Sequence, residues 1–335
     1  MTATSERRTA ASPRAWSRKR WLLAAELGAT ALVLLLPGLI GNAYHLRLAQ
    51  DVAILAILAL SLTLIFGFTG QISLGQAAFY AVGGYGSAIV QTELGVPAPL
   101  AWLFAIALGM AAAYVISLPL LRIHGHFLAL GTLALGLIVE TMLVQLVPLT
   151  GGHDGILLPS VVHLGQWITA RFPYIVAIFL VLAYWLVRNL TARSVGRSFL
   201  ALRDDPQGAA ALGIPVTRYK TLAFMIGGGL AAAAGVLYAH HTQVITPEVF
   251  GFGTSIQALL VVVIGGMTSR FGALVGAAIV VLLPEWLVFL EENENLVFGL
   301  LVLGALLFLP GGVVGGIGSA IAWVRRSLDR KGGAA

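Results

Sequence analysis

The sequence predicts an all-α, polytopic transmembrane helical bundle, and three observations support this fold class. The 335 residues are 59% hydrophobic and only 10% charged, whereas a soluble globular protein carries about 25% charged residues. The mean hydropathy is +0.93. Apolar runs of roughly 20 residues, the length that crosses about 30 Å of hydrocarbon, recur from Trp21 almost to the C-terminus. These runs leave no room for a sizeable soluble domain.

The apolar runs predict about ten spans. In chain order, they are expected at 22–40, 49–66, 76–92, 98–121, 127–148, 172–188, 219–240, 254–268, 272–290 and 295–317. An even number of spans places both termini on one side. The first run is longer than the apolar core of a typical secretory signal, so we interpret it as a span. Cleavage at the nearby Gly41-Asn42-Ala43 is the open alternative.

The distribution of charge predicts the orientation, because Lys and Arg gather on the cytoplasmic side. With both termini inside, 18 of the 20 basic residues are cytoplasmic, and Arg47 and Arg171 are the exceptions. The opposite side receives the acidic residues Glu93, Asp154, Glu248, Glu291, Glu292 and Glu294. We expect basic cytoplasmic tails at 1–20 and 319–335, and a transmembrane domain at 21–318 with an inner loop at 189–218. The net charge of +6 is therefore a topology signal rather than a nucleic-acid surface.

The composition also limits the chemistry. The chain has no cysteine, which excludes disulfides, thiolate metal sites and cysteine nucleophiles. The histidine pairs His124/His126 and His240/His241 lie at the ends of predicted spans, where imidazole reaches interfacial water, so we expect no metal site. The sequence has no G-x-S-x-G or H-E-x-x-H motif, and none of its three lysines follows a glycine, as a Walker A lysine does. We expect neither catalysis nor a bound cofactor in this chain, so any ATP is held elsewhere.

The inner loop contains the signals of a short helix. Asp205 is a good N-cap and Pro206 suits the first helical position, while Gly213 suits the left-handed position after the last turn. The helix has a face of small residues from Gly208 through Ala209 to Ala211, which fits a groove on another protein. The polar rim of that face comprises Arg197, Arg203, Asp204 and Asp205. An ordinary solvated loop helix is the alternative.

A second unusual segment, residues 67–76, places glycines and polar side chains at membrane depth. Irregular backbone is tolerated there only where it is buried in protein or lines a water-filled cavity. We predict a re-entrant or broken segment beside a solute path, and a plain packed turn is the alternative. The candidate path residues are Gly70, Gln71, Ser73, Gly75, Gln76 and the intramembrane Glu140. Segment 65–75 also resembles segment 263–272, which raises the hypothesis of an internal repeat. Chance similarity between glycine-rich membrane loops is the alternative.

Several motifs occur together in one order along the chain. They are GFTGQISLGQAAF at 67–79, FLALGTLALGLI at 127–138, TGGHDG at 150–155, ALRDD at 201–205, AAALGI at 209–214, VIGGM at 263–267 and LPGG at 309–312. With these motifs, residues 50–318 resemble the permeases of branched-chain amino acid ABC transporters, of the LivM-like type. In that family, the inner loop resembles the coupling loop that docks on the ATPase. The acidic residue of the general loop pattern is absent here, because Gln207-Gly208-Ala209 stand in its place.

The resemblance implies a subunit of a bacterial inner-membrane importer for branched-chain or related hydrophobic amino acids. It also implies four kinds of partner: a homologous second permease, two ATP-binding subunits that hold ATP and Mg, an extracytoplasmic solute-binding protein, and membrane lipid. Urea, short amides or an aromatic acid are alternative cargoes. A stand-alone secondary transporter and an intramembrane enzyme are the rival functions.

Overall fold

The computed structural model describes residues 13–123, 125–158 and 166–287, with short pieces at 299, 303–304 and 312–316. The predicted tail 319–335, residues 1–12 and most of the predicted span 295–317 lie outside the described residues. His124 lies outside them as well. Residues 13–20, which we predicted as part of a cytoplasmic tail, belong to the first helix.

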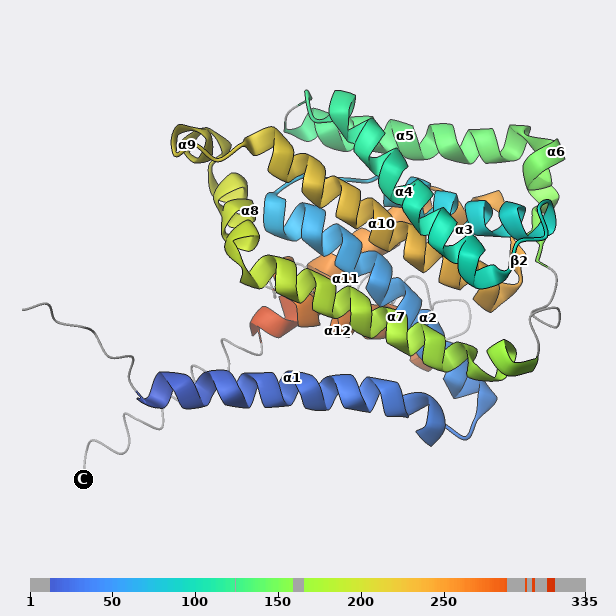
Figure 1. Cartoon of the computed structure of the whole chain (residues 1–335), viewed down its shortest axis with the longest axis horizontal. Helices are drawn as coiled ribbons and strands as arrows, with labels where there is room; N and C mark the ends of the chain where they lie inside the picture. The colour runs from blue at the N-terminus through green and yellow to red at the C-terminus, as the bar shows by residue number, and fades with distance from the viewer. Residues whose placement is uncertain are drawn as a thin grey trace, which may run out of the picture.

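The described chain is almost entirely helical (Figure 1). Its elements are α1 (Pro13–Leu39), α2 (Ala43–Leu62), η1 (Thr63–Phe68), α3 (Gln76–Thr92), α4 (Ala98–Leu120), α5 (His126–Gln145), α6 (Val147–Thr150), η2 (Gly152–Asp154), β1 (Ile156–Leu157), α7 (Gln166–Ala192), α8 (Ser194–Asp204), α9 (Pro206–Ala211), α10 (Val216–Thr242), β2 (Val244–Ile245), η4 (Pro247–Phe250), α11 (Phe252–Gly265) and α12 (Arg270–Leu287). The two short strands pair antiparallel, with Ile156 opposite Ile245. The chain is therefore an all-α protein, as predicted.

Five described helices are long and apolar enough to cross a membrane. They are α2 with η1, α4, α5, α7 and α10. Helices α11 and α12 pass the same test only as a pair, bent by 118° at the intervening turn. Helix α3 has 17 residues, which is shorter than a full span. The structure therefore supports five or six long spans among the described residues, while ten crossings with both termini inside stay a prediction.

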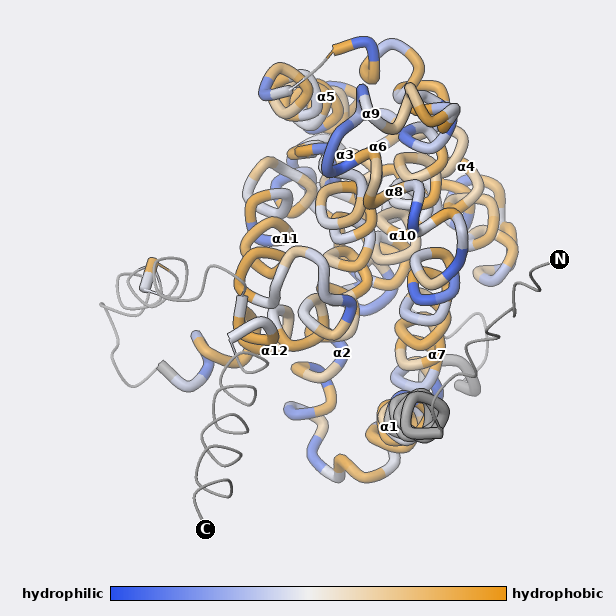
Figure 2. The backbone as a smooth tube through the Cα atoms, turned by 90° about the vertical axis from the view of Figure 1, so that its left-hand side faces the viewer, coloured by the Kyte–Doolittle hydropathy of each residue, from blue (hydrophilic) through white to orange (hydrophobic). Residues whose placement is uncertain are grey.

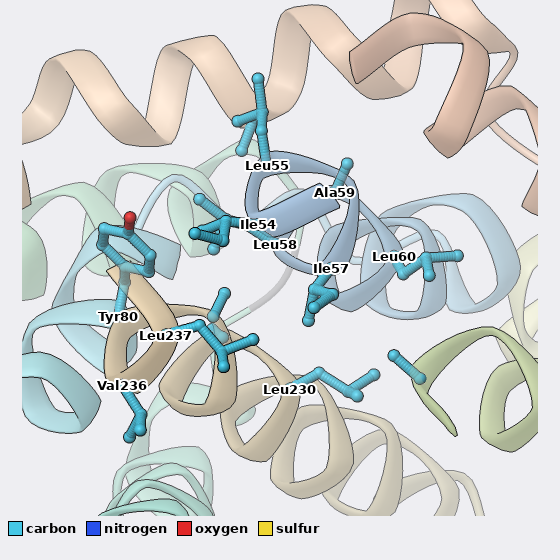
Figure 3. Packing of buried hydrophobic residues seen from close by; sticks show 14 of the residues in the cluster. Ile54, Leu55, Ile57, Leu58, Ala59, Leu60, Tyr80, Leu230, Val236 and Leu237 are labelled. Atoms are coloured by element: carbon cyan, nitrogen blue, oxygen red, sulfur yellow. The ribbon is translucent and has the colours of Figure 1, made fainter. Parts of the chain in front are cut away.

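The core forms where α10 packs along α2, α3 and α4. Small residues bring these helices together at backbone distance, because a Cβ at Gly235 would overlap the backbone oxygen of Tyr80, and one at Gly83 would overlap that of Ala232. Leucine and isoleucine side chains of α2 fill the remaining space, next to Leu230 and Leu237 of α10 (Figure 3). The glycines of this core therefore serve close helix packing.

The two ends of the bundle differ in their elements. Helices α8 and α9 lie at one end, and α6 and the β1–β2 pair lie at the other (Figure 1). These ends correspond to the predicted cytoplasmic and extracytoplasmic sides. Between them, α12 packs closely on α11 at Gly272 and Gly276, since a Cβ at Gly276 would overlap the backbone oxygen of Val261.

Helix α1 lies at the periphery, beside α7 and apart from the core (Figure 2). An ion pair ties it to α7, with 2.5 Å between Arg188 Nε and Glu26 Oε2. The Tyr184 hydroxyl donates to the other oxygen of Glu26 at 3.4 Å. Two largely buried charges thus neutralise each other, as the cost of burying an ionised group requires.

Candidate functional site

The glycine-rich segment begins where α2 ends in the π-helical turn η1. Gly70 adopts a left-handed φ of +69° and closes this helix, and its N–H donates to the Phe66 carbonyl at 3.1 Å. The chain then returns into the bundle as an extended connection before α3 begins (Figure 1). Residues 69–75 are therefore irregular backbone inside the bundle, as the prediction of a broken segment requires.

The polar side chains of this connection are buried and only partly hydrogen-bonded. Gln71 Nε2 donates to Thr69 Oγ1 at 2.6 Å, and the Ser61 hydroxyl donates to Gln76 Oε1 at 3.2 Å. Within residues 69–76, three buried atoms have no hydrogen-bond partner in the described part of the chain: Gln71 Oε1, the Ser73 hydroxyl and Gln76 Nε2. Leaving such atoms unpaired costs about 1–3 kcal/mol each, so groups of this kind call for a functional explanation.

Hydrogen bonds from two other helices fix the start of α3. The Leu74 N–H donates to Thr132 Oγ1 of α5 at 2.9 Å, and the Ala77 N–H donates to Ser255 Oγ of α11 at 3.0 Å. Gly75 has no side chain because the Thr132 carbonyl lies 2.6 Å from where its Cβ would be. The first turn of α3 thus places the N-terminal end of a helix, which is the positive end of its dipole, within the bundle.

The predicted inner-loop helix exists as α9. The Asp205 carboxylate accepts from the Gln207 N–H at 2.9 Å, and Gly213 has the expected left-handed φ, here +80°. The predicted small face differs in one respect, because Ala209 is only 3% exposed and points into its own chain. Leu212 is 83% exposed instead, so the surface that α9 offers to another protein centres on this leucine.

Sequence reasoning missed the second helix of the inner loop, α8. Its Phe199 and Leu202 are fully buried, and Phe199 packs with Leu64 and Phe68 at the end of α2. The signal was present, because Val195, Phe199 and Leu202 have the spacing of one helical face. The inner loop is therefore a pair of helices, one of which is anchored in the bundle.

Arg203, at the end of α8, connects the inner loop to the glycine-rich segment. Its Nη1 donates to the Gly67 carbonyl at 3.2 Å, and its Cγ lies 3.2 Å from where a Cβ of Gly70 would be. On another side, Gly67 abuts the backbone carbonyl of Met267 in the turn between α11 and α12 so closely that a Cβ would overlap it. We call Gly67, Gly70, Arg203 and Met267 the Gly67 junction.

The junction also joins the two segments that resemble each other, 65–75 and 263–272. Each ends a helix at a glycine with positive φ, Gly70 and Gly266, and the two meet at Gly67 and Met267. This contact between similar segments is what an internal repeat produces. The duplication itself stays a hypothesis.

Glu140 lies on α5, away from the other candidate path residues. Its carboxylate packs on the backbone of Gly251, where an added Cβ would lie 2.8 Å from Oε1. Gly251 is the N-cap of α11, so the negative charge lies at the positive end of that helix. The structure therefore gives Glu140 a stabilising environment.

The remaining candidate residues of the inner loop, Arg197 and Asp204, are exposed at the end of the bundle that carries α8 and α9.

A family model described as the permease component of the branched-chain amino acid transport system matches residues 44–309. The chain belongs to this family of permeases. The match covers every described helix from α2 to α12 and the whole Gly67 junction. As a family member with several long apolar helices, this permease is a multi-pass membrane protein and a transport component rather than an enzyme.

Named relatives agree with the family. The chain is 32% identical to the high-affinity branched-chain amino acid transport system permease protein LivM of Salmonella typhimurium, over 80% of this chain and 69% of the relative. It is 29% identical to the corresponding LivH protein of Escherichia coli K12, over 78% and 91%. It is 30% identical to the autoinducer 2 import system permease protein LsrC of Salmonella paratyphi B, over 65% of each chain. No solved structure matches the chain.

Proposed function

We propose that this permease is one of two homologous transmembrane subunits of an ABC importer in the bacterial inner membrane. Separate ATPase subunits, which bind ATP and Mg, drive it, and an extracytoplasmic binding protein delivers the solute. The cargo is a branched-chain or related hydrophobic amino acid. The observation that carries the proposal is the Gly67 junction. There the side chain of Arg203, at the end of the inner-loop helix α8, donates a hydrogen bond to the buried backbone carbonyl of Gly67.

The junction supports a coupling role for the inner loop. The outer surface of the loop, formed by Arg197, Asp204, Asp205 and Leu212, receives the ATPase. Movement of α9 reaches α8 through Asp205, the residue that ends α8 and caps α9. Because Phe199 and Arg203 hold α8 against η1, the movement is passed to residues 67–70. Alternating access needs such a rigid connection between the ATPase and the solute path.

The unpaired polar atoms support a solute path along Gln71, Ser73 and Gln76. An amide oxygen, a hydroxyl and an amide nitrogen together accept from an ammonium group and donate to a carboxylate. The N-terminus of α3 adds a positive dipole, which suits the carboxylate of an amino acid. Glu140 lies against Gly251 instead, so its part in the path is to hold α11 in place beside α5.

The names of the relatives support the partners and the cargo. Two of them are the LivM and LivH permeases of branched-chain amino acid systems, which fits a pair of homologous subunits. The LsrC relative belongs to an autoinducer 2 import system, so similar permeases serve chemically different solutes. Urea, short amides or an aromatic acid therefore stay alternative cargoes, and the solute-binding protein is expected to decide among them.

Arg203→Ala tests the coupling role. In proteoliposomes containing the complete transporter and its binding protein, we expect ATP hydrolysis to continue while leucine uptake falls at least about tenfold. The physical reason is that the variant loses a hydrogen bond from a charged donor, worth about 1.5–3 kcal/mol. Arg122→Ala is the matched control, an exposed arginine at the same end of the bundle but outside the inner loop. Normal uptake per ATP in the Arg203 variant would refute the coupling role.

The stand-alone secondary transporter is the main rival, and it makes the opposite prediction for the isolated chain. We expect the purified permease in liposomes to take up no leucine under a proton or sodium gradient. Uptake under these conditions without nucleotide would favour the rival.

A further inference from the structure

A cavity of about 250 Å³, partly open to the outside, lies between the helices toward the end that carries the β1–β2 pair. Helices α2, α3, α10, α11 and α12 and the turn η4 all contribute to its wall. The polar side chains that line it are Asp51, Tyr80, Tyr238, Thr254 and Gln257. It has room for about eight water molecules at roughly 30 Å³ each, so it is too large to be a packing defect. The glycine-rich segment does not line it.

We propose that this cavity binds a small solute with a primary ammonium group, for which Asp51 is the counter-ion. Among the described residues, Asp51 is the one charged residue in the lining. Its Oδ1 pairs with His241 Nε2 at 3.0 Å, while Oδ2 makes no hydrogen bond to a described residue. The carboxylate is 40% exposed, so a solute can reach it.

The aromatic groups of the lining suit a cation as well. The rings of Tyr80 and Tyr238 lie 5.7 Å apart, and Phe250 packs against Tyr80 at 5.1 Å. Tyr80 is only 4% exposed, yet its hydroxyl makes no hydrogen bond within the described chain. Figure 3 shows this hydroxyl pointing away from Val236 and Leu237 and lying beside Ile54 of the cavity wall. Tyrosine faces attract ammonium groups, and the free hydroxyls accept hydrogen bonds from them.

The rest of the cavity wall is apolar, and this favours an organic ammonium ion over an inorganic cation. Ile54, Leu58 and Val281 are among the lining residues and offer no ligand to a metal ion. An inorganic cation prefers several oxygen ligands of which more than one is usually a carboxylate. A short aliphatic chain ending in an ammonium group fits one carboxylate, two tyrosines and this apolar wall.

Binding of 3-methylbutylamine to the full-length chain in phosphatidylcholine nanodiscs tests the proposal. By isothermal titration, we expect saturable binding of the amine but neither of the isosteric 3-methylbutanol nor of 4-methylpentanoate. Asp51→Asn should weaken amine binding at least about tenfold, because a hydrogen bond to a charged group is lost. Glu93→Gln, which removes an exposed carboxylate at the end of α3, should leave the affinity unchanged.

Val281→Phe covers the case in which Asp51→Asn fails to fold. It fills the cavity from a partly exposed position on α12 and leaves both residues of the Asp51–His241 pair in place. We expect it to abolish amine binding while the thermal unfolding curve shows a folded protein. The proposal is overturned if the alcohol binds as tightly as the amine, if sodium competes equally with the amine, if the folded variants bind like the wild type, or if no amine binds. The assay uses neither ATP nor another subunit, so its result is independent of the transport proposal.

Discussion

The central and the outer helices of this permease are similarly apolar but are buried to very different extents. Within the chain, 83% of the apolar stretch of α2 and 78% of that of α10 is buried, against 17% for α5. Helix α4 packs on α10 with one face only, and 22% of its apolar stretch is buried. The central helices carry small residues at their contacts, whereas α5 exposes Phe127, Leu130 and Met142. Hydropathy thus predicts that a helix lies in the membrane, while small residues decide which helices pack at backbone distance.

Replacing one phenylalanine by alanine in each region should produce the largest difference in the free energy of unfolding. Phe224 of α10 is fully buried and packs edge-to-face on Phe79, while Phe127 of α5 is 72% exposed. We expect Phe224→Ala to lower the free energy of unfolding by about 3–5 kcal/mol through loss of packing and a cavity. Phe127→Ala should change it by less than about 0.5 kcal/mol. Urea unfolding in detergent micelles measures both, and equal losses would mean that α5 is also part of the core.

Adding one methyl group at a glycine in the core should give the next largest loss of stability. Gly235→Ala places a Cβ against the Tyr80 carbonyl, so α3 and α10 must separate, at a cost of about 1–3 kcal/mol. Gly28→Ala is the matched control on the peripheral α1, where no atom lies within 4 Å of the added Cβ. There we expect no loss, or a small gain from helix propensity. The same unfolding assay decides, and a stable Gly235 variant would contradict the backbone-distance packing.

Helix α5 allows the comparison to be made within one element. Thr132 accepts a hydrogen bond from Leu74 of the glycine-rich segment, whereas the exposed Thr141 only donates to Leu137 of its own helix. Thr132→Val should cost about 1–2 kcal/mol, because the Leu74 N–H loses its acceptor. Thr141→Val should change stability by less than about 0.5 kcal/mol. Similar costs at both positions would mean that the Leu74 N–H finds another acceptor.

Cysteine substitutions at exposed positions of the two ends of the bundle should change stability least. Such positions are therefore suitable for labelling experiments that determine the membrane topology. The chain has no natural cysteine, so Leu212→Cys on α9 and Asp154→Cys in η2 provide single probes. With a membrane-impermeant maleimide on intact spheroplasts, we expect labelling at 154 but not at 212, because basic loops lie inside. The reverse pattern would refute the predicted orientation and the docking role of the inner loop.

Much of the fold and part of the candidate site could be predicted, each from a local signal. The caps of α9 follow from Asp205, Pro206 and Gly213 because capping depends on neighbouring backbone groups. The membrane character follows from composition. The burial of Ala209 could not be predicted, since α9 is too short to show which of its faces its own chain covers. The contact of Glu140 with the N-terminus of α11 could not be predicted either. It joins two residues that are more than a hundred positions apart, and no local pattern encodes such a contact.

The sequence alone determined the long apolar helices, the cap of α9 and the glycine-rich break, because these depend on side chains within a few residues of one another. Only the tertiary structure decided that Arg203 donates to Gly67, that Gly67 abuts Met267, and that Asp51 faces two tyrosines across a cavity. The reason is that the hydropathy of a residue does not say whether its side chain faces lipid or another helix. In a bilayer, apolar residues suit both lipid and protein neighbours, so the contacts that bring polar groups together are set by how the small residues let the helices pack.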